Sequence, residues 1–190
     1  MNDKDVSHMQ INLPNIDLPY PKRPKENSED VISRAVSSIL PSVLAWVEPG
    51  MRLDDSEVEH VKDELIDALT YEYYGDGYDI VKYLDQTYGW DGGAELVDVF
   101  EEAFFKRREA YREVVKEWVY SAGVMPRKKV GDSVSFFSGG KKYRGVVSRV
   151  DTDHAQYLLF SEEMGHKMPG SFKGSGYTGV YVNYEDVVDE

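Results

Sequence analysis

The stretch that decides the fold is AELVDVFEEAFFKRREAYREVVKEWVY, residues 94–120. Its apolar side chains recur mostly at steps of three and four residues, which is the period of one helical face. The members of this stripe are Leu96, Phe100, Phe104, Tyr111, Val114, Val115 and Trp118. At about 1.5 Å per residue, such a helix would extend about 40 Å. The stretch therefore predicts a long spine helix, ended by Gly123 and Pro126.

Shorter helices are predicted before this spine. Ser28, with two acidic residues after it, is typical of a helix start, and Pro41 would kink that helix or restart it. A second helix opens at residues 54–56, with apolar positions on one helical face: Val58, Val61, Leu65, Ile66 and Leu69. YYGDGY ends it, and a short helix over residues 78–88 follows. These elements together predict a helical domain over residues 29–122.

The hydrophobic period changes after residue 126. Short runs rich in Val, Tyr and Phe follow, several of them alternating, and turns rich in glycine and serine separate them. SFFSGGKKY, residues 135–143, predicts a hairpin with Gly139 and Gly140 at its turn. Four or five strands in about sixty residues predict a small antiparallel β-barrel over residues 126–190. The predicted fold class is therefore α+β, an acidic helical N-terminal domain followed by this barrel.

The strand pattern also carries a resemblance. VGDSVSF, a glycine turn, YRGVVSRVD, YLLF and GVYVNYEDV occur in this order within residues 129–188. In this order they resemble SH3-like small barrels of the Tudor and KOW type, and the resemblance implies a binding module without a fixed activity. The aromatic side chains of this segment would either line a binding groove or fill the barrel core. They are Phe136, Tyr143, Tyr157, Phe160 and Tyr181.

The N-terminal residues 1–28 predict a different kind of segment. Prolines stand at positions 14, 19, 21 and 24, and such spacing favours extended, polyproline-like chain over helix. We expect an extended proline-rich arm that either docks on a surface or is a disordered leader.

Several function classes are excluded or lack their motifs. The chain has no cysteine, which excludes a disulfide scaffold, a thiolate zinc site and a cysteine nucleophile. GSGYTG at 174–179 matches a dinucleotide fingerprint, but a strand-like run follows it where a helix is required. No histidine pair has convincing ligand spacing, and neither G-x-S-x-G nor a P-loop occurs. We therefore expect a non-catalytic protein without metal or cofactor. The absence of a signal-like start and of a long apolar run predicts a soluble, cytoplasmic one.

Charge is distributed unevenly along the chain. The net charge is −13, yet residues 29–102 alone carry nineteen acidic and four basic side chains, a net of −15. Such a block repels nucleic acid and attracts basic surfaces. On the second predicted helix, Asp55, Glu59, Asp63 and Asp67 recur every four residues, which places one carboxylate on each turn of one face.

Aromatic residues follow this acidic ridge closely. YEYYGDGYDIVKYLDQTYGW, residues 71–90, holds six tyrosines and a tryptophan among acids and glycines. Tyrosine and tryptophan are typical of interface hot spots. The predicted partner-binding residues are the ridge together with Tyr71, Tyr74, Asp76, Tyr78, Trp90 and Asp91. The partner would be a basic protein surface, such as that of a nucleic-acid-binding protein, which the chain inhibits or regulates as a nucleic-acid mimic. Inhibitors of the immunity and anti-defence type have this composition.

Three alternatives remain open at this point. The acidic face would be no more than a solvated helix surface if nothing basic binds it. In a second alternative, the barrel binds nucleic acid through Lys128, Lys129, Lys141, Lys142 and Arg144. In a third, the chain is a structural adaptor in a larger particle, joined through the proline-rich arm.

Overall fold

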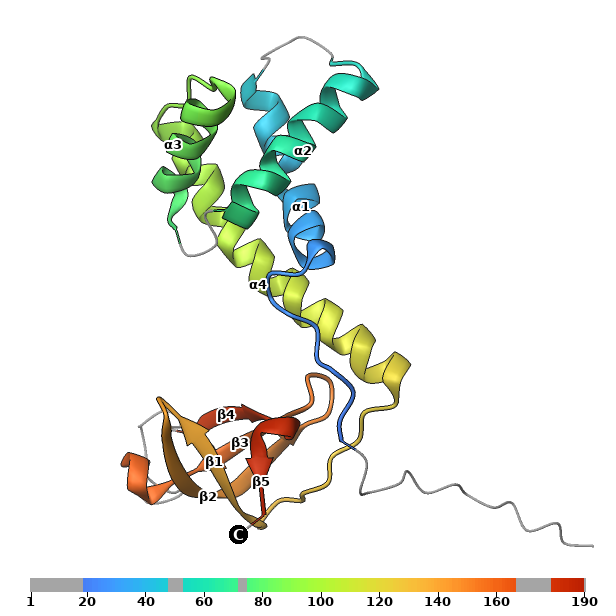
Figure 1. The fold of residues 1–190 in the computed structure, drawn as a ribbon, viewed down its shortest axis with the longest axis vertical. Helices are drawn as coiled ribbons and strands as arrows, with labels where there is room; N and C mark the ends of the chain where they lie inside the picture. Colours follow the sequence, from blue (N-terminus) through green and yellow to red (C-terminus); the bar gives the residue numbers. More distant parts are fainter. Residues whose placement is uncertain (1–18, 48–52, 72–74, 167–178, 190) are drawn as a thin grey trace, which may run out of the picture. The chain divides into compact units, whose positions relative to one another are not determined.

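A computed structural model describes residues 19–47, 53–71, 75–166 and 179–189 (Figure 1). Within these residues, four α-helices are followed by a curled sheet of five antiparallel strands that forms half a barrel, so the predicted α+β class is confirmed. The helices are α1 Glu29–Val47, α2 Asp55–Tyr71, α3 Gly77–Tyr88 and α4 Ala94–Ala122. The strands are β1 Ser133–Ser138, β2 Lys141–Asp151, β3 Gln156–Phe160, β4 Val180–Asn183 and β5 Val187–Val188.

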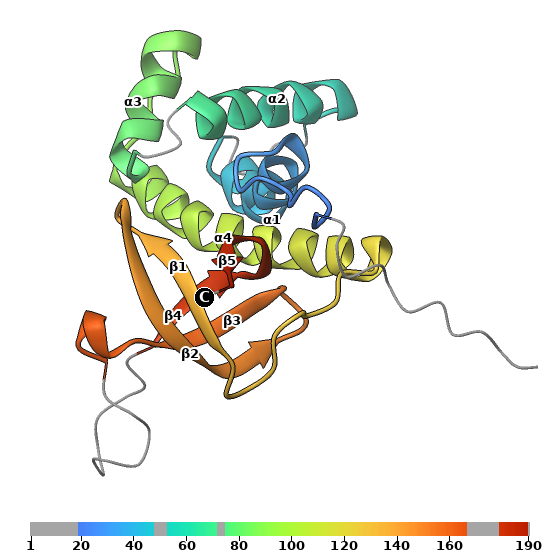
Figure 2. The ribbon, with the colours of Figure 1, turned by 60° about the horizontal axis from the view of Figure 1, so that its bottom comes forward.

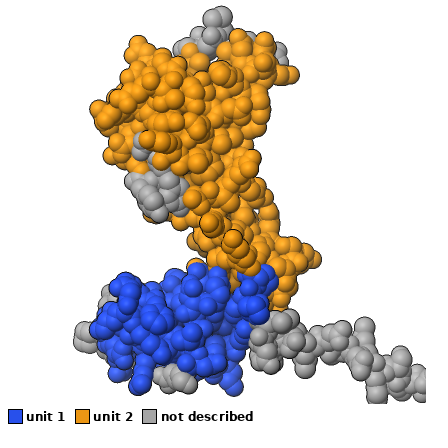
Figure 3. Space-filling view, in the orientation of Figure 1, with its two compact units in different colours: residues 1–21, 126–150, 157–190 blue, residues 22–125, 151–156 orange. Residues whose placement is uncertain are grey.

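The chain divides into two compact units (Figure 3). The helical unit comprises residues 22–125 together with 151–156, the turn between β2 and β3. The sheet unit comprises residues 1–21, 126–150 and 157–190. Most of the predicted arm, residues 1–18, lies outside the described residues. Residues 19–25 contain neither helix nor strand.

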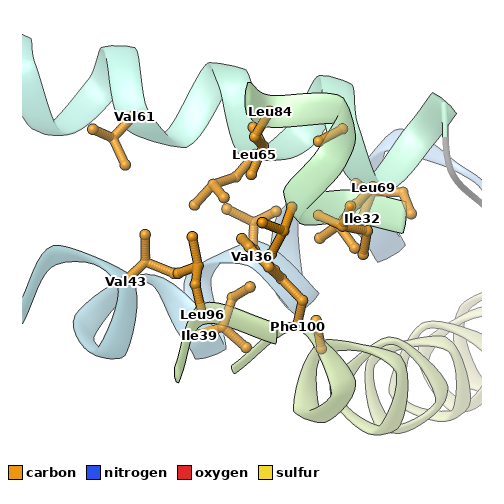
Figure 4. Close-up of a cluster of buried hydrophobic side chains, with 14 residues drawn as sticks. Ile32, Val36, Ile39, Val43, Val61, Leu65, Leu69, Leu84, Leu96 and Phe100 are labelled. Atoms are coloured by element: carbon orange, nitrogen blue, oxygen red, sulfur yellow. The ribbon is translucent and has the colours of Figure 1, made fainter. Parts of the chain in front are cut away.

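The core of the helical unit is built from all four helices (Figure 4). Helix α1 packs against α2 and α4, and α3 packs against the same two helices. Apolar side chains that recur at helical spacing meet between them and are shielded from water: Ile32, Val36, Ile39, Val43, Leu65, Leu69, Ile80, Leu84, Leu96 and Phe100. Burying a side chain of this size stabilises the fold by about 1.5–3 kcal/mol, which makes this cluster the main support of α2 and α3.

Helix α1 is continuous through Pro41, where the sequence predicts a kink or a restart. It is long and apolar enough by composition to cross a membrane, with a mean hydropathy of 1.3, although the sequence alone suggested no such segment. Its apolar side fills the core described above, since Ile32, Val36 and Ile39 are buried there.

Helix α4 buries a face slightly different from the predicted stripe. Leu96, Phe100 and Val114 are buried as expected, but Ala103 and Ala110 lie between them, while Phe104, Tyr111 and Trp118 are only partly buried. Alanine has no bulk beyond Cβ, so a neighbouring helix can approach α4 closely there. Val31 of α1 packs against Ala110 and Val114 in this way.

The sheet has the strand order β4-β3-β2-β1-β5 (Figure 2). Strands β1 and β2 form the predicted hairpin, and both turn glycines have positive φ, 57° at Gly139 and 77° at Gly140. Strand β5 pairs with the other side of β1. Phe136, Tyr157 and Phe160 are buried in this unit. Tyr143 is half-buried, and Tyr181 is 50% exposed. The resemblance to Tudor and KOW barrels stays a prediction.

Candidate protein-binding surface on α2 and α3

The predicted acidic ridge is exposed along α2. Asp55, Glu59, Asp63 and Asp67 all face solvent. The helix begins where the sequence places it because Asp54 Oδ1 accepts the backbone N–H groups of Ser56 and Glu57, at 2.9 and 3.0 Å. One ridge carboxylate is partly neutralised, since Lys62 Nζ lies 3.0 Å from Glu59 Oε1.

The C-terminal end of the ridge carries an arrangement that joins rings to a carboxylate. Asp67 Oδ2 accepts two hydrogen bonds, one from the Tyr83 hydroxyl and one from the Tyr88 hydroxyl, each 2.7 Å long. These bonds stabilise the ionised carboxylate, so they hold the pKa of Asp67 below its usual value. The same contact raises the pKa of Tyr83 and raises that of Tyr88 to about 12. Asp67 therefore stays charged while its tyrosine partners stay protonated.

The three rings around Asp67 contact one another. Tyr71 stacks on Tyr83 with their ring centroids 4.6 Å apart, and Tyr88 meets Tyr83 edge-on at 6.3 Å. Tyr71 is 70% exposed and Tyr88 38% exposed. We call Asp67, Tyr71, Tyr83 and Tyr88 the tyrosine cluster. It presents fixed ring surface directly beside the acidic ridge.

Trp90 lies at a second ring–carboxylate contact. Its Nε1 donates to Glu64 Oε2 at 2.7 Å, and the other oxygen of Glu64 lies 3.2 Å from His60 Nε2. The Trp90 ring stacks on Trp46 at 6.4 Å and is half-buried against the helical core. Its contacts are thus those of a side chain that ties residues 89–93 to α2.

The remaining predicted site residues occupy varied positions. Asp76 caps α3 through a reciprocal pair of bonds with Asp79, and it is exposed. Tyr78 is 63% exposed on the first turn of that helix, and Asp91 is exposed in the loop before α4. Tyr74 lies outside the described residues.

Sequence reasoning missed the roles of Tyr83 and Tyr88. The spacing of Asp67 and Tyr71, one helical turn apart, was visible in the sequence. The partners from α3 are brought to Asp67 only by tertiary packing of α3 on α2, for which the local spacing carries no signal.

The basic residues of the alternative interpretation all lie in the sheet unit. Lys128 forms an ion pair with Asp189 and is only partly exposed. Lys129, Lys141, Lys142 and Arg144 are exposed. Within the described parts of the chain, no group of three or more His, Cys, Asp or Glu side chains is arranged to hold a metal ion.

No protein-family model matches this chain, and neither a curated protein nor a solved structure matches it. What α2 and α3 offer is exposed negative charge beside exposed tyrosine rings on one helical unit.

Proposed function

We propose that this chain is a non-catalytic inhibitor or regulator that occupies the basic, nucleic-acid-binding surface of another protein. The observation that carries the proposal is the exposed acidic ridge on α2, with one carboxylate on each helical turn, ending at the tyrosine cluster. Turns lie about 5.4 Å apart along a helix. This repeat is near the spacing of successive phosphates along a nucleic-acid strand, so a groove that binds phosphates would also bind the ridge.

The tyrosine cluster adds contact area at low entropic cost. Because Tyr83 and Tyr88 donate to Asp67 and Tyr71 stacks on Tyr83, the rings are already ordered in the free protein. Side chains fixed before binding lose little freedom on association. Arginine stacks well on tyrosine rings and pairs with carboxylates, so an arginine-rich groove would engage ring and ridge together.

The first experiment captures the partner. The full-length protein is immobilised, exposed to lysate of its native host at low and at high salt, and the retained proteins are identified by mass spectrometry. Nucleic-acid-binding proteins should be retained at low salt and released at high salt, because ionic strength screens exposed charge. The captured protein should then lose its labelled nucleic acid when this chain is added.

The matched variants decide whether the ridge is responsible. Asp55→Lys combined with Asp63→Lys reverses two ridge charges and leaves the Glu59–Lys62 pair and the tyrosine cluster in place. Glu113→Lys combined with Glu162→Lys changes the net charge equally at exposed positions on α4 and in the sheet unit. Capture should be lost with the first double variant and kept with the second. If both double variants lose capture equally, the ridge acts only as part of the overall negative charge of the protein.

A further inference from the structure

The β1–β2 hairpin differs in charge from the rest of the protein. In a chain of net charge −13, residues 133–150 contain four basic side chains and no acidic one. We call these residues the basic hairpin. They comprise β1 and most of β2, joined by the two turn glycines.

An exposed ring lies among these charges. Val134 and Phe136 of β1 are buried in the sheet unit, so Phe137, the next residue, points to the opposite face of the sheet, where it is 61% exposed. Lys142 is the residue directly across from Phe137 in the strand register, and Arg144 is across from Ser135. Directly opposite residues have Cβ atoms about 4.5–5.5 Å apart, and diagonal ones remain within reach of long side chains. Phe137 thus has a lysine beside it and an arginine on its diagonal.

We propose that this face of the basic hairpin binds single-stranded nucleic acid, with one base stacked on Phe137 and neighbouring phosphates held by Lys142 and Arg144, which share that face in the strand register. Phenylalanine has no polar tip, so its exposed face offers stacking and nothing else. Only an unpaired base has a free face to stack, which favours a single strand over a duplex. This interaction is independent of the acidic ridge, which lies on the other unit.

Glu163 limits the path that a bound nucleic-acid strand can follow across the basic hairpin. Its Oε2 accepts the backbone N–H of Arg144 at 3.4 Å, which places a carboxylate at the β2 side of the face. The nucleic-acid strand is therefore expected to follow Phe137 toward the hairpin turn, where Lys142 is exposed. Few phosphates would be held, so the affinity should be modest and measurable mainly at low salt.

The test is fluorescence anisotropy of the full-length protein with a labelled single-stranded oligonucleotide of about twelve nucleotides, a length within known site sizes. About two phosphate contacts predict a roughly seven-fold loss of affinity between about 50 and 200 mM salt. Phe137→Ala should weaken binding about ten-fold, and Phe137→Trp should retain it. Lys142→Glu should weaken it as well. The control Tyr181→Ala removes a ring that is 50% exposed in the same unit and should change nothing.

Three outcomes would overturn the inference. They are no binding at about 50 mM salt, equal binding by Phe137→Ala and the wild type, and a duplex bound as tightly as a single strand. Sedimentation of the same variants tests the other occupant that the hairpin would fit, which is the acidic helices of a second copy of this chain. If the protein forms a dimer that Lys142→Glu dissociates, while the oligonucleotide has no effect on it, the hairpin binds a second copy instead. Each of these results leaves the proposed function of the ridge untested and intact.

Discussion

Replacing Gly77 with alanine should destabilise the helical unit, because this position is where α3 touches α4. A Cβ at Gly77 would lie 2.5 Å from the carbonyl oxygen of Val97 and 3.1 Å from the backbone nitrogen of Glu101. Both are backbone atoms of α4, so they cannot rotate away as a side chain would. The Gly77 N–H also donates to Glu101 Oε1 at 3.0 Å, which fixes the same contact.

The magnitude follows from two opposing effects. Overpacking costs about 1–3 kcal/mol, and the cost belongs to the upper half of that range here because the clashing atom is backbone. Alanine recovers up to about 1 kcal/mol over glycine in a helix, and less at its first position. The net loss should be about 2 kcal/mol, which corresponds to a fall in Tm of about 8 °C for a unit of roughly a hundred residues.

Thermal and urea unfolding, followed by far-ultraviolet circular dichroism, would measure this loss. Gly92 and Gly93, which come directly before α4, supply the controls. At Gly93, the N-cap of α4 with φ of −91°, a Cβ would meet nothing within 4 Å, so Gly93→Ala should lose only the difference between glycine and alanine as caps, about 0.5–1 kcal/mol. At Gly92 a Cβ would lie 2.7 Å from Val81 Cγ1 and 3.1 Å from Leu96 Cδ2, which are side-chain atoms and not backbone, so the loss should be intermediate. If Gly77→Ala is as stable as the wild type, or Gly93→Ala loses as much, the placement of α3 on α4 is wrong.

Three further predictions concern the helical unit. Phe100→Ala, which empties a fully buried site, should lower the free energy of unfolding in urea by about 3–5 kcal/mol. A loss below about 1 kcal/mol would contradict the burial of Phe100 in the helical core. The pKa of Asp67 is lowered in the folded protein, so the contribution of this carboxylate to stability is present above about pH 4 and is lost as pH falls through the folded pKa. Asp67→Asn should therefore flatten the acidic limb of a curve of Tm against pH. An unchanged curve would refute the hydrogen bonds from Tyr83 and Tyr88 to Asp67. Ultraviolet titration should show Tyr88 ionising with a pKa near 12, and Asp67→Asn should bring this pKa back toward 10. A wild-type Tyr88 that already titrates near 10 would show that its hydrogen bond to Asp67 is absent.

Much of the architecture could be predicted because its signals are local. The period of α4 is long enough to be unambiguous, and Gly139–Gly140 predicts its hairpin from two residues. The buried face of α4 was predicted less well, since large rings were favoured over Ala103 and Ala110. Ring size reports hydrophobicity, whereas close helix packing selects small residues, and single-sequence periodicity does not separate the two.

The candidate surface could be predicted only in part, for a related reason. The acidic ridge follows from four-residue spacing within one helix, and its exposure on α2 was expected. The tyrosine cluster depends on α3 packing beside α2, and no residue of α3 signals that its hydroxyl will bond Asp67. The crowding of rings and carboxylates thus has an intramolecular explanation at Asp67 and Glu64, while Tyr71 and Tyr78 remain largely exposed.

The most direct test of the central claim is the affinity of the captured partner for the ridge variant, measured by calorimetry at two salt concentrations. The account predicts that Asp55→Lys with Asp63→Lys abolishes binding, while Glu113→Lys with Glu162→Lys keeps wild-type affinity and its steep salt dependence. A ridge variant that binds as tightly as the wild type would contradict the account.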